Sequence, residues 1–275
     1  MDDEIRNRFA QLAAQPDADI RLDEAALLIA AEAEQDISVE HYLSELDDLA
    51  VRFKADGRFQ KGLDIPVSAL VNYIHDDLGF SGNITDYYDP TNSYLNRVID
   101  YKHGIPISLA LVHISIGSRL NIPVSGISFP GHFLVQYGGG SGTIVDPFSG
   151  RELSRTDCQN MLEQIAGPRA ALKEEYFSPA SPRDVLIRML DNLKQIFWRQ
   201  KSWEESKACI DRQLLLLPGR EEFNVQLGAV YEMQGNTALA HHTYTQILQG
   251  ASDDKLKQLA SKRLLALASD SKTIH

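Results

Sequence analysis

The chain of 275 residues is 43% hydrophobic and 24% charged, which is ordinary for a globular protein and predicts one large domain or two smaller ones. The formal net charge of −11 at pH 7 argues against a nucleic-acid-binding protein, because phosphate binding requires clustered lysine and arginine.

The sequence contains no signal for export or membrane insertion. Its N-terminal segment, M-D-D-E-I-R-N-R-F, lacks a basic region followed by an apolar run, and no stretch approaches the ~18 apolar residues of a membrane span. The two cysteines, Cys158 and Cys209, are far apart and match no disulfide or metal-binding pattern. We expect a cytoplasmic protein without a cofactor.

Charge is distributed unevenly along the chain. Residues 183–275 contain 13 lysines and arginines against 11 acidic residues, whereas residues 1–182 contain 14 against 27. The segment S-P-A-S-P at 178–182 has the composition of a linker. We therefore predict two domains, residues 1–182 and residues 183–275.

The N-terminal region predicts three helices. Strong helix formers occupy 25–34, apolar residues recur at helical spacing over 38–57, and a helix that begins at a proline covers 66–79. Ser38 is the expected cap of the second helix and Gly57 its expected end.

Residues 81–100 are expected to form a loop that leads into a short helix. The segment D-Y-Y-D-P within the loop contains two carboxylates, but loops collect aspartate and proline for turn chemistry. No neighbouring histidine or cysteine completes a ligand set, so we expect no metal here.

The central stretch, residues 104–146, predicts a buried helix followed by strands. Pro106 suits the first turn of a helix that ends near Asn121 and is apolar nearly all round, as in a domain interior. Two short strands follow at 132–137 and 143–146, joined by a glycine-rich linker.

The hairpin formed by these strands determines whether His132 and Asp146 meet. Side chains alternate along a strand, so the two residues share a face only if the loop has an odd number of residues. A loop of residues 138–140 pairs them directly, and a loop of residues 138–142 makes them diagonal neighbours. Both lengths are common for hairpins that contain glycine.

The remainder of the chain is expected to be helical. A surface helix begins at Thr156 or Asp157, which are alternative caps, and ends at Gly167. From Arg183 onward the pattern becomes repetitive, with a degenerate first repeat and a capping helix over 254–267. The positions of the clear repeat that match the tetratricopeptide pattern are Leu227, Gly228, Tyr231, Ala240 and Tyr244.

Ser108, His132 and Asp146 form a candidate catalytic triad. Ser108 lies in the first turn of the central helix, His132 at the start of a strand and Asp146 at the end of the next. A serine nucleophile requires a general base in hydrogen-bond contact, and that base is oriented by a carboxylate. The three residues have the right chemical types for these roles.

Each member of this triad also has a structural explanation. Serine is common in the first turn of helices, histidine at a strand end is often a hydrogen-bonded polar group, and aspartate before proline is typical of turns. Two further histidines are alternative bases, although His103 precedes the helix in a turn and the helical period directs His113 away from Ser108.

Four motifs in this region resemble a known family: N-S-Y-L-N-R-V, G-I-P-I-S-L-A, P-G-H-F and V-D-P-F-S-G. Residues 87–153 resemble the transglutaminase-like core of the papain-type superfamily. Together with the tetratricopeptide tail, the chain resembles a bacterial family that has been linked to invasion-gene regulation and that is also similar to a domain of a eukaryotic F-box protein.

The resemblance implies an α+β protein. Its papain- or transglutaminase-like core would follow a helical N-terminal region and precede an all-α tetratricopeptide-like module. The cysteine of the superfamily falls on Ser108, its histidine on His132 and its acid on Asp146, so this chain lacks the thiolate on which that chemistry depends. Asn96 and Tyr94, just upstream, are candidate hydrogen-bonding groups for the site.

Two functions follow. The first, which we favour, is a non-enzymatic pseudoenzyme that binds a protein or peptide through its cleft and helical repeats, because the thiol is missing and repeat solenoids present binding faces. The second is a serine-dependent hydrolase or acyltransferase that acts on an amide or ester through Ser108, His132 and Asp146.

Overall fold

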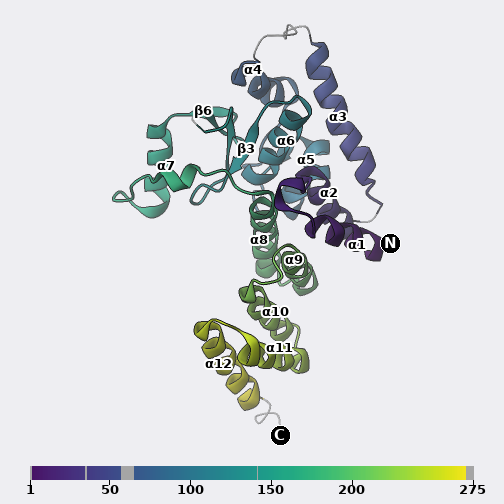
Figure 1. The fold of residues 1–275 in the computed structure, drawn as a ribbon, viewed down its shortest axis with the longest axis vertical. Helices are drawn as coiled ribbons and strands as arrows, with labels where there is room; N and C mark the ends of the chain where they lie inside the picture. The colour runs from purple at the N-terminus through teal and green to yellow at the C-terminus, as the bar shows by residue number, and fades with distance from the viewer. Residues whose placement is uncertain (1, 35, 57–64, 141, 271–275) are drawn as a thin grey trace. The chain divides into compact units, whose positions relative to one another are not determined.

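The computed structural model describes residues 2–34, 36–56, 65–140 and 142–270, and the chain forms two compact units (Figure 1). Unit 1 comprises residues 1–189 and unit 2 residues 190–275. The division falls within helix α8 (Pro182–Gln200), because the first turn of α8 is bound to unit 1. There the Arg183 guanidinium donates to the carbonyl oxygen of Ala13 across 2.8 Å.

The N-terminal helices of unit 1 follow the pattern expected from the sequence. They are α1 (Asp2–Ala13), α2 (Leu22–Ala33), α3 (Val39–Ala55) and α4 (Val67–Asn72). The apolar centre of α2, residues 25–30, is completely buried. Ser38 caps α3 as predicted, by accepting a hydrogen bond from the backbone of His41 at 3.2 Å. The predicted end of α3 at Gly57 lies outside the described residues.

The third predicted helix, residues 66–79, is an α-helix in its first part and a π-helix in its second. After α4 the chain continues as a π-helical turn, η2 (Tyr73–Asp77), and Gly79 then leaves the helix with φ +78°. Insertions of this kind are common at functional sites. Here the turn places the imidazole ring of His75 against Gly150. A β-carbon added at Gly150 would lie 2.7 Å from that ring.

The central helix α6 (Pro106–Arg119) is the buried axis of unit 1. It is preceded by the short helices η3 (Pro90–Ser93) and α5 (Leu95–Tyr101) and by a parallel ladder of β1 (Ser81–Gly82) and β2 (His103–Gly104). As predicted, Pro106 opens α6, and the chain turns away at Asn121, which has φ +57°.

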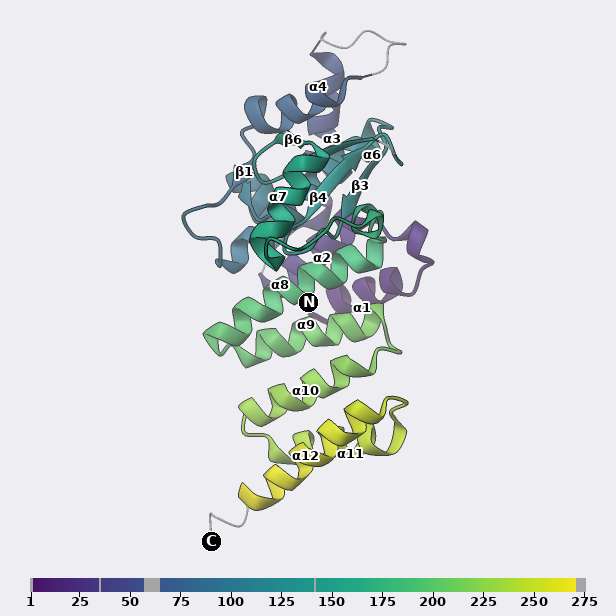
Figure 2. The ribbon, with the colours of Figure 1, turned by 90° about the vertical axis from the view of Figure 1, so that its left-hand side faces the viewer.

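A four-stranded antiparallel sheet packs against α6 (Figure 2). Its strands are β3 (Val124–Ile127), β4 (Leu134–Tyr137), β5 (Thr143–Asp146) and β6 (Arg151–Leu153), in that order. Tyr137 pairs with Thr143, so residues 138–142 connect the strands. This register confirms the five-residue alternative, but the predicted strand start at His132 was wrong, because β4 begins at Leu134 and His132 lies in the turn before it.

The other face of the sheet is covered by α7 (Arg155–Ala166) and η4 (Glu174–Phe177). The apolar residues that fill this layer are Ile127, Phe129, Leu134, Ile144, Cys158, Leu162 and Phe177. The predicted caps of α7 were wrong. Ser154 caps the helix, because its hydroxyl accepts from the backbone of Asp157 while the Asp157 carboxylate accepts from the backbone of Ser154.

Unit 2 is helical throughout its described part. Beyond α8 it contains α9 (Trp203–Leu216), α10 (Glu221–Met233), α11 (Thr237–Gly250) and α12 (Asp254–Asp270). Gly228 of α10 allows the ring of Tyr244 in α11 to approach so closely that a β-carbon would lie 2.7 Å from it. The apolar core between α11 and α12 is centred on Tyr244 and Ala260.

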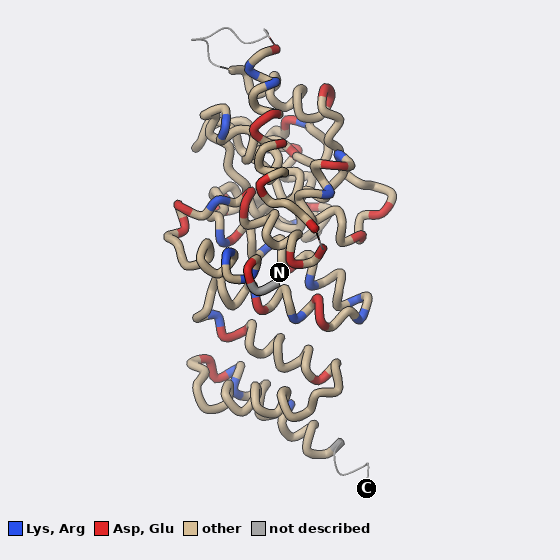
Figure 3. Tube along the Cα trace, turned by 90° about the vertical axis from the view of Figure 1, so that its right-hand side faces the viewer, with Lys and Arg blue, Asp and Glu red and all other residues tan. Residues whose placement is uncertain are grey.

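Charged groups stabilise the surface between the N-terminal helices and α6. Acidic residues are prominent along unit 1 in Figure 3. Arg119, at the C-terminal end of α6, pairs with Asp23 at 2.8 Å and Asp47 at 2.5 Å, where a cation also suits the negative end of the helix. None of the helices among the described residues is both long and apolar enough to span a membrane.

Candidate functional site

His132 and Asp146 form a direct hydrogen-bonded pair. His132 Nε2 lies 2.8 Å from Asp146 Oδ1, and both side chains are mostly buried, with 20% and 15% of their surface exposed. His132 lies two residues before β4 and Asp146 ends β5, so the hairpin register brings the two groups together. A carboxylate on one ring nitrogen fixes the orientation of the imidazole, as a general base requires.

Asp146 is held in its charged form by three donors. Besides His132, the backbone of Phe148 donates to Oδ1 at 2.9 Å and the Ser149 hydroxyl donates to Oδ2 at 2.7 Å. Burial alone would raise the pKa of Asp146, but the hydrogen bonds from His132, Ser149 and Phe148 outweigh it and hold the pKa below its ordinary value. The carboxylate is therefore anionic at neutral pH.

Gly131 gives His132 its position. Gly131 has φ +67°, and a β-carbon there would lie 2.7 Å from Cδ1 of Ile165 in α7. Only glycine satisfies both the backbone conformation and the close approach. The P-G-H-F motif is therefore a tight turn, packed under α7, that delivers the imidazole toward Asp146.

Ser108 is completely buried and its hydroxyl is bonded to the backbone. The Oγ atom donates toward the carbonyl oxygens of Asn92 at 2.5 Å and Ile105 at 3.0 Å, and it accepts from the Ile105 amide at 3.1 Å. Among the described residues these are the hydrogen bonds of Ser108, and none involves His132. The structure thus joins two of the three predicted triad residues, His132 and Asp146, by a direct hydrogen bond.

The role of Ser108 in these contacts is structural. It occupies the third position of α6 and accepts from the amide of the capping residue Ile105, which also donates to the Asn92 carbonyl at 3.4 Å. Gly104 makes room for it, since a β-carbon at Gly104 would lie 2.7 Å from the Ser108 hydroxyl. The motif G-I-P-I-S is therefore sufficiently explained as a helix entry.

The other two predicted site residues are not joined to the histidine or the aspartate by any hydrogen bond described for them. Asn96 is buried in α5, and its amide donates to Glu34 of α2 at 2.9 Å, beside the ion pair between Glu34 and Arg97. Tyr94 is buried and begins α5. None of the hydrogen bonds described for Asn96 or Tyr94 involves His132 or Asp146, so the roles of Asn96 and Tyr94 in the site stay predictions.

A second polar cluster lies inside unit 1, and most of it has no signature in the sequence. His113 Nδ1 is hydrogen-bonded to the phenol of Tyr137, and His113 Nε2 lies 3.1 Å from Nε2 of His75. Only His113 was considered beforehand, as an alternative base. The four-residue strand that contains Tyr137 and the π-helical turn that carries His75 bring the other two groups to it.

The three groups form a directed chain of hydrogen bonds. No second acceptor for the Tyr137 phenol is found among the described residues, so the phenol donates to Nδ1 of His113. A neutral His113 then donates from Nε2 to His75. Burial lowers the pKa of His113 to about 3, with a further contribution from His75, and burial also lowers the pKa of His75. Both imidazoles are therefore neutral at pH 7.

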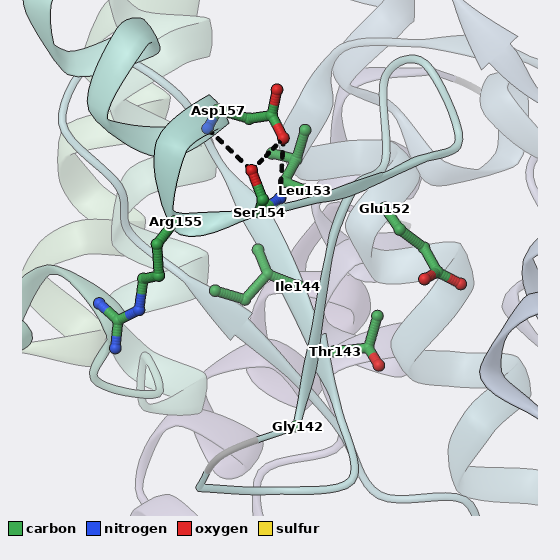
Figure 4. A pocket seen from close by; sticks show the side chains of 8 residues that line it. All are labelled: Gly142, Thr143, Ile144, Glu152, Leu153, Ser154, Arg155 and Asp157. Carbon is green, nitrogen blue, oxygen red and sulfur yellow. Dashed lines mark hydrogen bonds between the residues drawn. The ribbon is translucent and has the colours of Figure 1, made fainter.

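No metal site is formed by the described residues, in which no three histidine, cysteine or acidic side chains are grouped. Cys158 and Cys209 are free and buried. A pocket of about 560 Å³ opens beside β5, β6 and the start of α7 (Figure 4), but it contains none of the triad residues. Three of its polar side chains are engaged in hydrogen bonds, Ser154 with Asp157, and Arg155 with Glu174.

Comparison with known proteins agrees with this fold. The model of the transglutaminase-like superfamily matches residues 40–191, which include α6, the sheet and the histidine–aspartate pair. A UPF0162 protein of Xylella fastidiosa is 33% identical over 243 residues, covering 86% of each chain, and a UPF0162 protein of Pseudomonas aeruginosa is 35% identical over 185 residues, covering 67% of each. The chain belongs to the transglutaminase-like superfamily and, within it, to the UPF0162 proteins.

A eukaryotic relative shares only part of the chain. Human F-box only protein 21 is 28% identical over 183 residues, which are 62% of this chain and 28% of the human protein. No solved structure matches the chain.

Proposed function

We propose that this protein is a catalytically degenerate member of the superfamily that acts as a protein-interaction and regulatory module. The observation that carries the proposal is the state of Ser108. Its hydroxyl is completely buried and donates to backbone carbonyls, not to the imidazole of His132. A serine becomes nucleophilic only when a base takes its proton, and here the proton is held by the carbonyl oxygen of Asn92.

The chemistry of the side chain supports the same conclusion. A thiol at a helix start is readily ionised there, because its pKa is near 8.5 and the helix dipole lowers it further. The hydroxyl of a serine ionises at far higher pH, so the dipole alone does not activate it. The pair of His132 and Asp146 then serves to fix the end of the hairpin beside β4 and β5.

The alternative is a serine-dependent hydrolase or acyltransferase. It is favoured by one observation, namely that Asp146 orients His132 as a general base would require. For this function, Ser108 would have to leave its contacts with Asn92 and Ile105 and become exposed.

Two further features support an interaction role. Unit 2 is composed of paired antiparallel helices whose sequence resembles tetratricopeptide repeats, and repeat stacks bind partners. The region similar to this chain makes up only 28% of human F-box only protein 21, so in that protein it is one part of a longer chain. From the free cysteines Cys158 and Cys209 we also infer a cytoplasmic location.

A fluorophosphonate probe, which reacts with activated serines, tests the proposal. We expect no labelling of the purified wild-type protein, under conditions in which a serine hydrolase is labelled completely. The Ser108→Ala and His132→Ala variants serve as matched controls. Labelling of wild type that disappears in both variants would establish the hydrolase and overturn the interaction proposal.

A further inference from the structure

The loop between β1 and η3 is braced by hydrogen bonds from two of its own side chains. The carboxamide oxygen of Asn83 accepts from the backbone of Thr85 at 3.1 Å and of Asp86 at 3.0 Å. The amide of Asn83 donates to the side chain of Asn92 at 3.0 Å, and the amide of Asn92 donates to the carbonyl of Asp86 at 2.6 Å. Two asparagines thus cross-brace the segment 83–92, which we call the Asn83–Asn92 loop.

The ends of this loop are fixed to the core of unit 1. Asn83 donates its backbone N–H to the carbonyl of Gly104 at 2.9 Å, which extends the ladder between β1 and β2. At the other end, the Asn92 carbonyl receives the Ser108 hydroxyl and the Ile105 amide. The loop projects outward after β1 in Figure 2, while hydrogen bonds to the core of unit 1 hold both of its ends.

Three large apolar residues of the Asn83–Asn92 loop face solvent. Ile84 is 85% exposed, Tyr88 57% and Tyr87 42%. Folding normally removes such side chains from water, and contiguous exposed apolar groups mark interaction sites. The two tyrosines are in edge contact, with ring centroids 5.3 Å apart, so they present one continuous surface.

This surface adjoins the histidine–aspartate pair. The ring of Tyr87 lies 6.1 Å from that of Phe148, whose backbone donates to Asp146. The carbonyl of Phe148 in turn accepts from the backbone of Gly82, just before the loop. The loop and the turn that carries Asp146 are therefore joined in one rigid edge of unit 1.

The charged residues of the loop itself, Asp86 and Asp89, are acidic. Residues 76–96 contain four aspartates, Asp76, Asp77, Asp86 and Asp89, and no lysine or arginine. Asp86 is exposed beside the apolar side chains. One basic side chain, Arg188, lies close enough for its charge to act on the phenol of Tyr87. A preformed apolar surface with an acidic surround is complementary to a segment that is both apolar and basic.

We propose that the Asn83–Asn92 loop docks a basic peptide segment of a partner protein, with aliphatic or aromatic side chains of the peptide lying on Ile84 and Tyr88 and its lysines or arginines facing Asp86 and its neighbours. This inference rests on the proposed interaction function and names its surface and partner chemistry. Because the loop is ordered in the free chain, docking costs little conformational entropy at this side of the interface.

Three fluorescein-labelled heptapeptides test the proposal by fluorescence anisotropy with the full-length protein. The first alternates lysine with leucine or phenylalanine, the second replaces each lysine with glutamate, and the third replaces each apolar residue with serine. We expect saturable binding of the first peptide, weakened by salt, and at least about tenfold weaker binding of the other two.

Substitutions in the loop locate the binding. Ile84→Ser and Tyr88→Ser are each expected to weaken binding of the first peptide about tenfold, and Asp86→Asn to weaken it several-fold at low salt. These side chains make none of the bracing contacts of Asn83 and Asn92, so the variants keep the fold, which circular dichroism verifies. Val51→Ser removes an aliphatic side chain that is 60% exposed on α3 and should bind like wild type.

Three outcomes would overturn the docking proposal: no binding of the first peptide, equal binding of the glutamate peptide, or an equal loss in Val51→Ser. Each is separate from the test of the proposed function. Labelling of Ser108 by the fluorophosphonate would refute the non-enzymatic function while leaving the loop as a docking surface, whereas failure of peptide binding leaves the labelling result unchanged.

Discussion

The Ser108 hydroxyl donates to the Asn92 carbonyl across 2.5 Å, and this contact joins the first turn of α6 to the loop that precedes α5. Ser108, the candidate nucleophile of the sequence analysis, is therefore a buried structural link. Its loss removes one buried hydrogen bond from the Asn92 carbonyl and one from the Ile105 amide, and leaves the longer bond of 3.4 Å between those two backbone groups.

We expect Ser108→Ala to lower the free energy of unfolding by about 1–3 kcal/mol, because the buried hydrogen bonds of its hydroxyl are lost. Scanning calorimetry measures the change. The matched control is Ser118→Ala, in the same helix but exposed, which should stay within about 0.5 kcal/mol of wild type. A Ser108→Ala protein as stable as wild type would show that the hydroxyl has no structural role.

Asp146→Asn is expected to destabilise the protein by about 1–3 kcal/mol at pH 7, because a charged acceptor of three hydrogen bonds is lost. The pKa of Asp146 in the folded chain lies below its ordinary value of 3.8. Its contribution is therefore complete above about pH 4 and disappears as pH falls through the folded-state pKa.

Urea unfolding at pH 7 and at pH 3 or below measures this difference. The gap between wild type and Asp146→Asn should narrow at the lower pH, where the wild-type carboxylate is also protonated. Ser149→Ala removes one donor and keeps the charge, so it should cost less than Asp146→Asn at pH 7. A gap that does not depend on pH would contradict the assignment of a stabilising carboxylate.

The buried histidines predict a second loss of stability on acidification, which begins at a higher pH than that of Asp146. The pKa of His113 falls from its ordinary value of 6.5 to about 3 on folding. The unfolded chain therefore binds more protons than the folded chain between these values, and stability must decrease as pH falls below about 6.5. One such group contributes a slope of at most about 1.4 kcal/mol per pH unit.

We expect His113→Leu to be less stable at pH 7 and to have a shallower decline of stability between pH 6.5 and pH 4.5. Tyr137→Phe is the matched control, since it removes the donor to His113 but keeps the imidazole, so it should lose stability while the steep decline remains. Chemical unfolding at a series of pH values gives both slopes. Equal slopes in His113→Leu and wild type would refute the neutral buried imidazole.

Much of the core was predictable because it depends on local patterns. The buried helix after Pro106 and the cap at Ser38 follow from periodicity and capping chemistry. The sequence permitted a contact between His132 and Asp146 without requiring it, since it left two loop lengths open, and the contact is formed from a turn before β4.

The remaining features depend on contacts between distant segments, which a single sequence does not reveal. The hydroxyl of Ser108 meets the Asn92 carbonyl only because the loop before α5 folds onto the start of α6. His75 reaches His113 through a π-helical turn that has no sequence signature. The cap of α7 was misplaced because Ser154, Thr156 and Asp157 are all good capping residues, and tertiary packing selects among them.

Gly131→Ala tests whether the turn before His132 positions the imidazole. The substitution introduces two costs, a positive φ of +67° for a residue with a side chain and a β-carbon 2.7 Å from Ile165. Gly139→Ala isolates the first cost, because Gly139 has φ +68° and nothing within 4 Å of the added carbon. It should cost about 1 kcal/mol, and Gly131→Ala about 2–4 kcal/mol.

The two costs are separated by relieving the steric contact. Adding Ile165→Ala to Gly131→Ala removes the atoms that the new β-carbon meets, so the double variant should recover the steric part and retain the backbone part seen in Gly139→Ala. Calorimetry gives the energies, and the NMR signals of His132 report whether the ring still lies on Asp146. If Gly131→Ala costs no more than Gly139→Ala and leaves those signals unchanged, α7 does not hold the turn in place.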